Sequence, residues 1–381
     1  MEGVRGAAVN RPVRLLVLTP VPEEGAGCRF RISQFVPALE RAGFAVTIAP
    51  FFDAAFFRLV YRHGLYAAKL RAFLRQTLAR LRLLRRRDRF DLVLVYREAY
   101  PFGPPVIEAL FARRDRPLVY DFDDAIFLSN SSEANRFASV FKYPRKVASI
   151  ISRSSAVIAG NEYLAGFARA HNPSVTVIPT CIDTDVFKPR TDAGPSGGVP
   201  VVGWIGTPTT AAYLRAIAAP LGRLAATRRF VFRVSGSSEP IAIDAVSVAN
   251  EPWSLDGEVR LFSTCDIGVY PLEDDEWARG KCGFKAIQFM ACGVPVVASA
   301  VGVNREIIED GVNGFLASTG DEWVEKAGRL LDDAALRRRI GAAGRETIEA
   351  RYSLRVNAPR LVATLRGVAD RVDRVSREVP S

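Results

Sequence analysis

The chain has 381 residues, of which 49% are hydrophobic and 24% are charged. This is the balance of an ordinary globular protein, and it excludes an intrinsically disordered or a collagen-like chain. Lysine and arginine outnumber aspartate and glutamate by 52 to 41, which gives a formal net charge of +11. The positive excess predicts anionic partners such as nucleotides, phosphates, nucleic acid or anionic lipid.

Cysteine and histidine usage narrows the class of protein further. The five cysteines are scattered without a Cys-x-x-Cys pair, and there are only two histidines. We therefore expect reduced thiols, no metal site and a cytoplasmic protein. No apolar run reaches the ~18 residues of a membrane span, and residues 13–18 are too short for a signal peptide and lack its cleavage pattern.

Short apolar runs rich in β-branched residues alternate with helical patterns along the first half of the chain. Such alternation predicts a parallel, doubly wound α/β sheet. The expected strands are residues 14–18, 45–49, 92–96, 118–120, 156–159 and 175–178, and the expected helices are 32–42, 65–87, 105–113 and 143–152.

A Pro/Gly/Ser-rich stretch at residues 188–198 has no periodicity and is typical of an interdomain linker. After it, strands are expected at 199–205, 230–235, 266–270 and 294–299, with helices at 210–226, 284–292, 322–331, 334–350 and 359–377. We thus predict an N-terminal domain (1–188), a linker (189–199), a C-terminal domain (200–355) and a final helix (356–381). We expect that helix to pack back toward the N-terminal domain.

The most informative segment is a basic, glycine-containing loop that leads into a short helix and then a buried strand, over residues 279–299. Arg279, Lys281 and Lys285 place three cations beside the start of that helix. The free N–H groups and partial positive charge of a helix N-terminus bind phosphate readily. The alternative is a solvated charge cluster on a loop.

Residues 281–299, followed by 301–316, resemble the donor-site signature of the family 4 glycosyltransferases. The match is closest at 290–299, and residues 177–187 and 265–271 support it. The resemblance implies the GT-B fold, in which two Rossmann-like domains face each other across a cleft. It also implies transfer of a sugar from a nucleotide-sugar with retention of anomeric configuration.

The sequence departs from the family pattern at two positions where the family has glutamates. Gly280 stands where the first glutamate helps to hold the donor sugar, and Gln288 stands where the second holds the ribose diol. An amide can still hydrogen-bond a diol, without the strength of a charged partner. The family's Arg and Lys near the start of the second domain have no match in residues 201–210. We expect donor contacts from Gly206, Thr207, Arg279, Lys281, Gly283, Phe284, Lys285 and Gln288.

The first domain carries a glycine turn after its first strand, with Gly25 and Gly27, and it resembles the turn beside the donor phosphate in the family. Close approach of a backbone to a ligand needs residues without bulk. Arg29 and Arg31 follow and are candidate phosphate or acceptor contacts. The alternatives are an ordinary turn and arginines on the solvated side of a helix.

Three carboxylates, Asp121, Asp123 and Asp124, cluster where the fourth expected strand ends. So dense a cluster is not expected in a core. We predict that these side chains, with Arg29, contact the reacting sugars, and that Arg97-Glu98 and Asn161-Glu162 line the same mouth. Helix N-capping by Asp123 or Asp124 is the alternative. Carboxylates could also hold a divalent ion, although the resembling fold does not usually need one.

Residues 66–89 are strongly basic and carry an apolar stripe at helical spacing. Its members are Leu70, Phe73, Leu74, Leu78, Leu81 and Leu84. A cationic amphipathic helix predicts contact with an anionic membrane surface. The alternatives are a helix that docks its stripe on the domain and RNA binding, but the aromatic-interleaved pattern of RNA-binding segments is missing.

Together these features predict a retaining hexosyltransferase without a cofactor, working at the cytosolic face of the membrane. Its acceptor would be a glycan or a lipid-linked saccharide of envelope or extracellular polysaccharide synthesis. The alternatives are a sugar-nucleotide epimerase and a non-catalytic binding protein of the same fold. A dinucleotide-dependent dehydrogenase is disfavoured, because the Gly-x-Gly-x-x-Gly turn with its acidic partner is missing.

Overall fold

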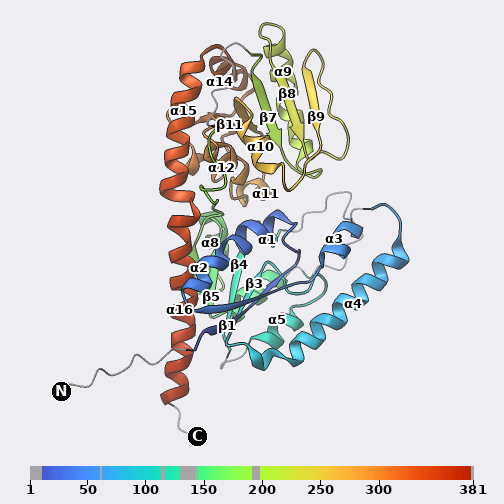
Figure 1. Ribbon diagram of the computed structural model, residues 1–381, viewed down its shortest axis with the longest axis vertical. Helices are drawn as coiled ribbons and strands as arrows, with labels where there is room; N and C mark the ends of the chain where they lie inside the picture. The colour runs from blue at the N-terminus through green and yellow to red at the C-terminus, as the bar shows by residue number, and fades with distance from the viewer. Residues whose placement is uncertain are drawn as a thin grey trace, which may run out of the picture.

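The computed structural model describes residues 11–60, 62–112, 116–128, 143, 145–190 and 198–378. They form two α/β units, one above the other in Figure 1, with a long C-terminal helix along one side of both. The predicted linker lies partly outside the described residues, at 191–197, so the domain boundaries stay a prediction.

The N-terminal unit is built on a six-stranded sheet in the order β2-β1-β3-β4-β5-β6. All neighbouring strands are parallel, as the alternation of strands and helices predicted. The strands are β1 (Val13–Thr19), β2 (Phe44–Pro50), β3 (Leu92–Tyr96), β4 (Leu118–Phe122), β5 (Ala156–Ala159) and β6 (Val175–Val177). The strand order reverses at β1 and β3, as in flavodoxin-like sheets.

The C-terminal unit has a second parallel sheet, in the order β12-β11-β10-β7-β8-β9. From its other edge this is the dinucleotide-binding order 3-2-1-4-5-6. The strands are β7 (Val201–Ile205), β8 (Val231–Ser235), β9 (Ser247–Glu251), β10 (Ile267–Tyr270), β11 (Val296–Ser299) and β12 (Phe315–Ala317). The sequence did not predict β9 and β12, because β9 is a partly exposed edge strand and β12 has three residues.

Helices cover both faces of each sheet. In β1, Leu15 and Val17 join one hydrophobic cluster, whereas Leu16 and Leu18 join the cluster on the opposite face, and all four are fully buried. A strand that is buried on both faces needs a continuous apolar run rather than alternation.

The helices of the N-terminal unit include the predicted ones with altered bounds and two, at residues 54–60 and 162–169, that were not predicted from the sequence. They are α1 (Ala26–Arg31), α2 (Val36–Arg41), α3 (Ala54–Val60), α4 (Tyr66–Arg85), α5 (Val106–Phe111), α7 (Lys146–Arg153) and α8 (Glu162–Arg169). The prediction of a single helix at 32–42 is wrong. Helix α1 ends at Arg31, a 3-10 turn (Ser33–Phe35) follows it, and a new helix, α2, begins at Val36. Pro37 explains the restart, since proline lacks an N–H and suits the first turn of a helix.

The helices of the C-terminal unit are α9 (Arg215–Ala225), α10 (Glu258–Ser263), α11 (Glu276–Arg279), α12 (Phe284–Ala291), α13 (Asn304–Ile307), α14 (Gly320–Asp332) and α15 (Ala334–Thr347). A π-helical turn (Ile348–Tyr352) then leads into α16 (Leu354–Glu378). Among the described residues, no helix is long and apolar enough to cross a membrane.

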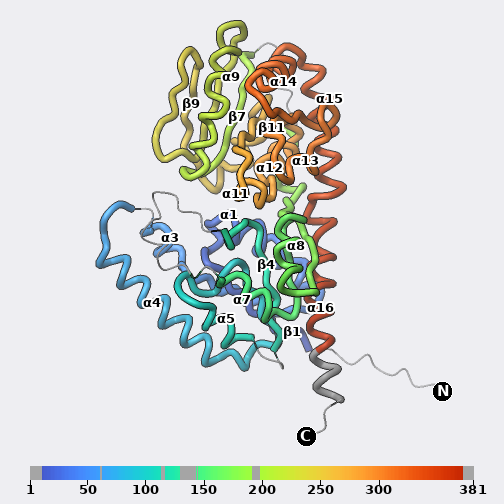
Figure 2. Tube along the Cα trace, turned by 180° about the vertical axis from the view of Figure 1, so that it is seen from behind, coloured from blue at the N-terminus to red at the C-terminus, as the bar shows by residue number. Residues whose placement is uncertain are grey.

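Helix α16 returns from the C-terminal unit to the N-terminal one, as both views show (Figures 1 and 2). Ala358, Leu361, Leu365 and Val368 complete the hydrophobic cluster beneath β1 and β3. Arg360 also donates a hydrogen bond to the carbonyl of Val177 (2.6 Å). The end of the chain is therefore part of the first core.

The two units touch directly. The ring of Phe30 on α1 packs against Phe284 on α12, with centroids 4.4 Å apart. Cys282, from the loop before α12, is buried in the N-terminal cluster that contains Ala125. The loops that carry the predicted site residues are thus held together by side chains from both units.

Candidate functional site

The switch points of the two sheets face the domain boundary. The strand order reverses between β1 and β3 in the first sheet and between β7 and β10 in the second. In open α/β sheets, ligands bind at such points, beyond the carboxyl ends of the strands. Gly25 and Gly27 follow β1, and Gly206 and Thr207 follow β7.

The glycine turn after β1 leaves no room for side chains. A Cβ at Gly27 would lie 2.5 Å from the hydroxyl oxygen of Tyr96, and one at Gly25 would lie 2.6 Å from a methyl of Val21. Such distances are sterically forbidden, so glycine is required for packing at both positions. This structural demand explains the glycines without invoking a ligand.

The turn after β7 is similarly crowded on one side. A Cβ at Gly206 would clash with the ring of Trp204. The amide of Thr207 already donates to the Thr210 hydroxyl (2.9 Å), although the residue itself is exposed. The Thr207 hydroxyl also lies within hydrogen-bond distance of the Thr209 and Thr210 hydroxyls (3.0 and 3.2 Å), so both polar groups of Thr207 have partners within the turn.

The start of α12 has the features of a phosphate site. Gly283 is the N-cap with φ +64°, and no side chain caps the first turn, so its N–H groups have no intrahelical acceptor. Lys281 and the half-buried Lys285 lie beside this turn. Burial lowers the pKa of Lys285 to about 8, although Glu258 opposes this shift. Lys285 therefore carries its charge near neutral pH and loses it at mildly alkaline pH.

A cross-domain network links Arg29 to α12. Arg29 Nη2 is 2.8 Å from Glu258 Oε2, and the side chains are only 14% and 6% exposed. The amide of Gln288 donates to Glu258 Oε1 (3.4 Å), and Lys285 donates to the Gln288 oxygen (3.2 Å). The structure thus brings together three predicted residues, Arg29, Lys285 and Gln288. Glu258 could not be singled out from the sequence, because no motif surrounds it.

The expectation that the three carboxylates lie outside the core is wrong for Asp121. Its side chain is buried and accepts two hydrogen bonds from Arg31 Nη2, at 2.7 and 2.9 Å. Arg31 is also buried and donates to the carbonyl of Ile178. Since each charge satisfies the other, Asp121 and Arg31 are internal structural partners, which argues against the predicted catalytic role of Asp121.

Asp123 and Asp124 converge on Arg97 instead. Arg97 Nη2 lies 2.7 Å from Asp123 and 2.5 Å from Asp124, and the Tyr96 hydroxyl donates to Asp123 (2.8 Å). Burial raises the pKa of Asp123, but Arg97 and Arg31 outweigh it and hold the pKa below its usual value. Burial raises the pKa of Asp124, which also interacts with Lys281 of the other domain.

Arg97 has a backbone φ of +59°, an unusual conformation for a side chain of this size. Strained backbone persists where surrounding contacts fix it, and it is concentrated at functional sites. The sequence analysis placed Arg97 near this mouth but did not identify it as the partner of both aspartates.

Gly280 has a structural explanation. A Cβ here would clash with that of Ala125 in the N-terminal domain. The backbone carbonyls of Gly280 and Lys281 both accept from the Asn161 amide (3.3 and 3.0 Å). The loop that carries a glutamate in the family therefore packs its backbone directly on the first domain.

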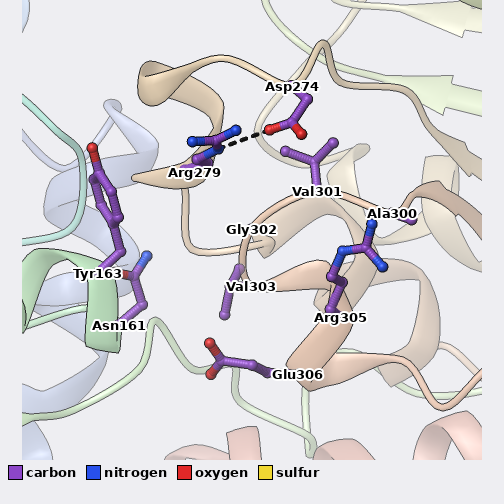
Figure 3. Close-up of a pocket in the computed structure, with 10 residues that line it drawn as sticks. All are labelled: Asn161, Tyr163, Asp274, Arg279, Ala300, Val301, Gly302, Val303, Arg305 and Glu306. Carbon is purple, nitrogen blue, oxygen red and sulfur yellow. Dashed lines mark hydrogen bonds and ion pairs between the residues drawn. The ribbon is translucent and has the colours of Figure 1, made fainter. Parts of the chain in front are cut away.

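Arg279, the third cation of the predicted cluster, is engaged by another residue of its own loop. It is exposed, and its Nε donates to Asp274 (2.8 Å). Both residues line a cavity of about 260 Å³ between the domains, shown in Figure 3. Tyr163 and Asn161 border it from the N-terminal domain, and residues 300–303, 305 and 306 line it from the C-terminal domain.

The predicted basic helix, α4, lies at the margin of the N-terminal unit in both views (Figures 1 and 2). Its apolar residues do not form a single stripe. Phe73 turns inward against Phe51 (5.4 Å between centroids), while Leu70, Leu74, Leu78 and Leu81 are exposed. Arg80 is buried rather than solvated and donates to the carbonyl of Ala49 (3.0 Å).

Two parallel α/β units that meet at a common boundary define a two-domain protein of the GT-B class. Solved structures agree on this fold. Sucrose-phosphate synthase from Thermosynechococcus elongatus has a TM-score of 0.65 at 17% identity, covering 94% of this chain and 99% of that one. HepE of Anabaena, solved with UDP and glucose, has a TM-score of 0.65 at 18% identity, covering 93% and 100%.

The comparison of sequences leads from the class to the family. Residues 27–186 match the profile described as Glycosyltransferase Family 4, and residues 199–333 match Glycosyl transferases group 1. The chain belongs to the family 4 glycosyltransferases. D-inositol 3-phosphate glycosyltransferase of Stackebrandtia nassauensis is 27% identical over 228 residues, 51% of this chain and 50% of that protein. The chain thus spans at most about half the length of such curated relatives.

Proposed function

We propose that the protein transfers a hexose from a nucleoside diphosphate sugar to a glycan or lipid-linked acceptor, with retention of configuration. The observation that carries this proposal is the chain of contacts from Arg29 of the first domain through Glu258 to Gln288 and Lys285 of α12, whose first turn is uncapped. One domain alone supplies an incomplete set of cations, so the site requires both domains.

The arrangement suits departure of a diphosphate. Negative charge grows on the leaving phosphate, and cations and N–H groups already aimed at it stabilise that charge without reorganisation. Lys281, Lys285 and the first amides of α12 would serve from the second domain. Arg29 would serve from the first. The UDP-bound relative of the same fold supports this type of donor.

We assign Asp123 and Asp124 to the acceptor side of this site. Arg97 fixes both carboxylates, and Asp124 is 22% exposed and interacts with Lys281. We assign them to hydrogen bonding with sugar hydroxyls. The acceptor would attack from the face that the phosphate leaves, and the departing phosphate oxygen would take its proton.

A turnover assay tests the proposal. The protein is incubated with UDP-, GDP- and ADP-hexoses and with saccharide acceptors, and free diphosphate and product are measured. NMR of the product should show the anomeric configuration of the donor. A product with inverted configuration would refute retention. Nucleotide binding without turnover of any sugar would favour the second candidate, a non-catalytic binding protein. The specific argument for that candidate is Gly280, which stands where the family has a glutamate.

We propose further that α4 holds the enzyme at an anionic membrane surface, where a lipid-linked acceptor of envelope or extracellular polysaccharide synthesis would lie. Leu70, Leu74 and Leu78 are 60%, 53% and 53% exposed. Exposed arginines flank them, at positions 71, 75, 82, 85 and 86. Apolar residues that enter the headgroup region beside cations are the pattern of an interfacial helix.

Vesicle sedimentation tests this placement. The protein should pellet with vesicles that contain phosphatidylglycerol and not with phosphatidylcholine alone, and salt should release it because charge attraction is screened. The double variant Leu74→Ser with Leu78→Ser should bind the vesicles more weakly than wild type. The matched control is Leu83→Ser with Leu84→Ser, which should reduce binding less when binding is expressed per folded molecule. Equal binding by wild type and the Leu74/Leu78 variant would show that α4 is not the contact.

A further inference from the structure

The N-terminal domain contains a cavity of about 260 Å³ between α4 and the segment that leads from β3 into α5. Helices α4 and α5 lie next to each other at the margin of the molecule (Figures 1 and 2). All residues that line the cavity fall within 77–107, so it is separate from the domain boundary. Most of the lining is apolar and comes from Leu81, Phe102, Pro104, Val106 and Ile107. Such a cavity is large enough for hydrocarbon, since an apolar cavity of about 150 Å³ already binds benzene.

One charged side chain lines this apolar cavity. Arg80 of α4 is 3% exposed, and its Nη1 donates to the carbonyl of Ala49 (3.0 Å). Its Nη2 is buried and, among the described residues, has no hydrogen-bond partner. The hydroxyls of Thr77 and Tyr100, which also line the cavity, lie 3.3 Å apart and pair with each other. The buried polar atom that is left unsatisfied here therefore belongs to a cation.

Arg80 also lacks a hydrogen-bonded counter-ion among the described residues. Glu108 acts on its charge, but Glu108 Oε1 accepts from the amide of Ala99 (2.9 Å) and lies 3.7 Å from Lys146 Nζ. Burial lowers the pKa of Arg80 to about 10, although Glu108 opposes this shift, so the guanidinium is charged at neutral pH. A buried charge is costly unless it is paired and hydrogen-bonded. Water would satisfy the N–H group without neutralising it, whereas an anion does both.

The cavity opens onto an exposed apolar surface. Leu81, Phe102 and Val106 line the cavity and are themselves exposed. Leu78 lies one turn before Leu81 on α4 and is exposed as well. A hydrocarbon chain that leaves the cavity can therefore continue over apolar side chains. The ligand that fits has an anion at one end, for Arg80, and hydrocarbon along the rest of its length.

We propose that this cavity binds a single hydrocarbon chain that ends in a phosphate or a carboxylate, with the anion at Arg80 and the chain along Leu81, Phe102 and Val106. The planar guanidinium suits either anion. This inference goes beyond the proposed function. Contact of α4 with a membrane surface requires only exposed side chains, whereas here one amphiphile is held by a buried arginine.

Ligand-detected NMR titration without vesicles tests this site. The probes are decyl phosphate, decanoate and 1-decanol, each below the concentration at which it forms micelles or separates from water. Wild type should bind at least one of the two anions tenfold or more tightly than 1-decanol, because a hydroxyl does not neutralise Arg80. The anion that binds more tightly identifies the head group as phosphate or carboxylate.

Two pairs of variants locate the binding. Arg80→Gln should lose the preference for the anion over 1-decanol, whereas Arg82→Gln, which removes an exposed arginine from the same helix, should keep it. Val106→Trp places a large ring at the mouth of the cavity and should weaken binding of the preferred anion at least tenfold. Leu110→Trp is its matched control, because Leu110 is an exposed residue of the same helix that does not line the cavity.

Since Val106 is exposed, the tryptophan pair tests the site even where Arg80→Gln does not fold. Equal affinity of wild type for the three probes, or binding of none of them, would overturn this inference. Unchanged binding in Val106→Trp would do the same, as would equal losses in Arg80→Gln and Arg82→Gln, which would indicate general attraction to a basic helix. Absence of sugar transfer or of vesicle sedimentation, in a protein that binds the anionic probe as expected, would count against the proposed function alone.

Discussion

The two sides of the domain boundary handle charge differently. On the N-terminal side, Asp121 is paired with Arg31, and Asp123 and Asp124 with Arg97, all within one domain. On the C-terminal side, Lys281 and Lys285 gather near a helix start, and Glu258 pairs with a residue of the other domain. The ion pairs of the first side lie within one domain, whereas Glu258 of the second side finds its partner across the boundary. The variants below test whether one side governs stability and the other governs binding.

The largest expected effect is on stability, at Asp121. Asp121→Ala leaves the buried Arg31 guanidinium without its partner, and breaking a buried pair from one side costs about 3–5 kcal/mol. Urea unfolding monitored by circular dichroism measures this change in the free energy of unfolding. The control is Glu162→Ala, which removes the exposed partner of Arg169 and should leave the free energy unchanged within error. Similar small losses for both variants would mean that the Asp121 pair is not a structural anchor.

The next effect is on binding, at the start of α12. Lys281→Ala with Lys285→Ala removes two cations beside the proposed diphosphate, and we expect about 2–3 kcal/mol weaker binding, or 30- to 150-fold. Stability should change little in comparison with Asp121→Ala. Titration of UDP, GDP and ADP provides the measurement.

Arg279→Ala serves as the control for this pair. Because Arg279 lines the cavity of Figure 3 and pairs with Asp274, it should leave nucleotide affinity unchanged. A loss in Arg279→Ala as large as in the double variant would restore the three-cation cluster that the sequence suggested.

The smallest effect is a dependence on pH. Burial lowers the pKa of Lys285 to about 8, so the ammonium that attracts the diphosphate is present below that pH and lost above it. Affinity should therefore fall as the pH rises from 7 to 9. Lys285→Arg keeps its charge throughout this range and should flatten the profile. Identical profiles for both proteins would assign the titration to another group.

The same contrast explains what the sequence could predict. The inner strands were found because a sheet covered on both faces requires continuous apolar runs such as residues 14–18. Lys285 and Gln288 could be singled out from the sequence because they lie three residues apart in one local motif. Glu258 and Arg97 acquire their roles only from partners that folding brings from distant parts of the chain.

Asp121 was given a role in the site from the sequence, whereas the structure buries it in an internal ion pair. In the sequence Asp121 stands at the end of a strand, close to Asp123 and Asp124. Side chains alternate between the two faces of β4, however, and that of Asp121 points into the domain, where it contacts Arg31. A buried partner cannot be recognised from sequence spacing, because Arg31 is 90 residues away. Gly280 likewise looked like the loss of a ligand contact, whereas the structure shows a close approach to Ala125.

Amide hydrogen exchange tests most directly whether both domains together bind the donor diphosphate. On addition of the tightest-binding of UDP, GDP and ADP, exchange should slow in residues 25–31 and in residues 283–288 of the same sample. Protection confined to the cavity around Tyr163 and Gly302, with none at these two segments, would contradict the account.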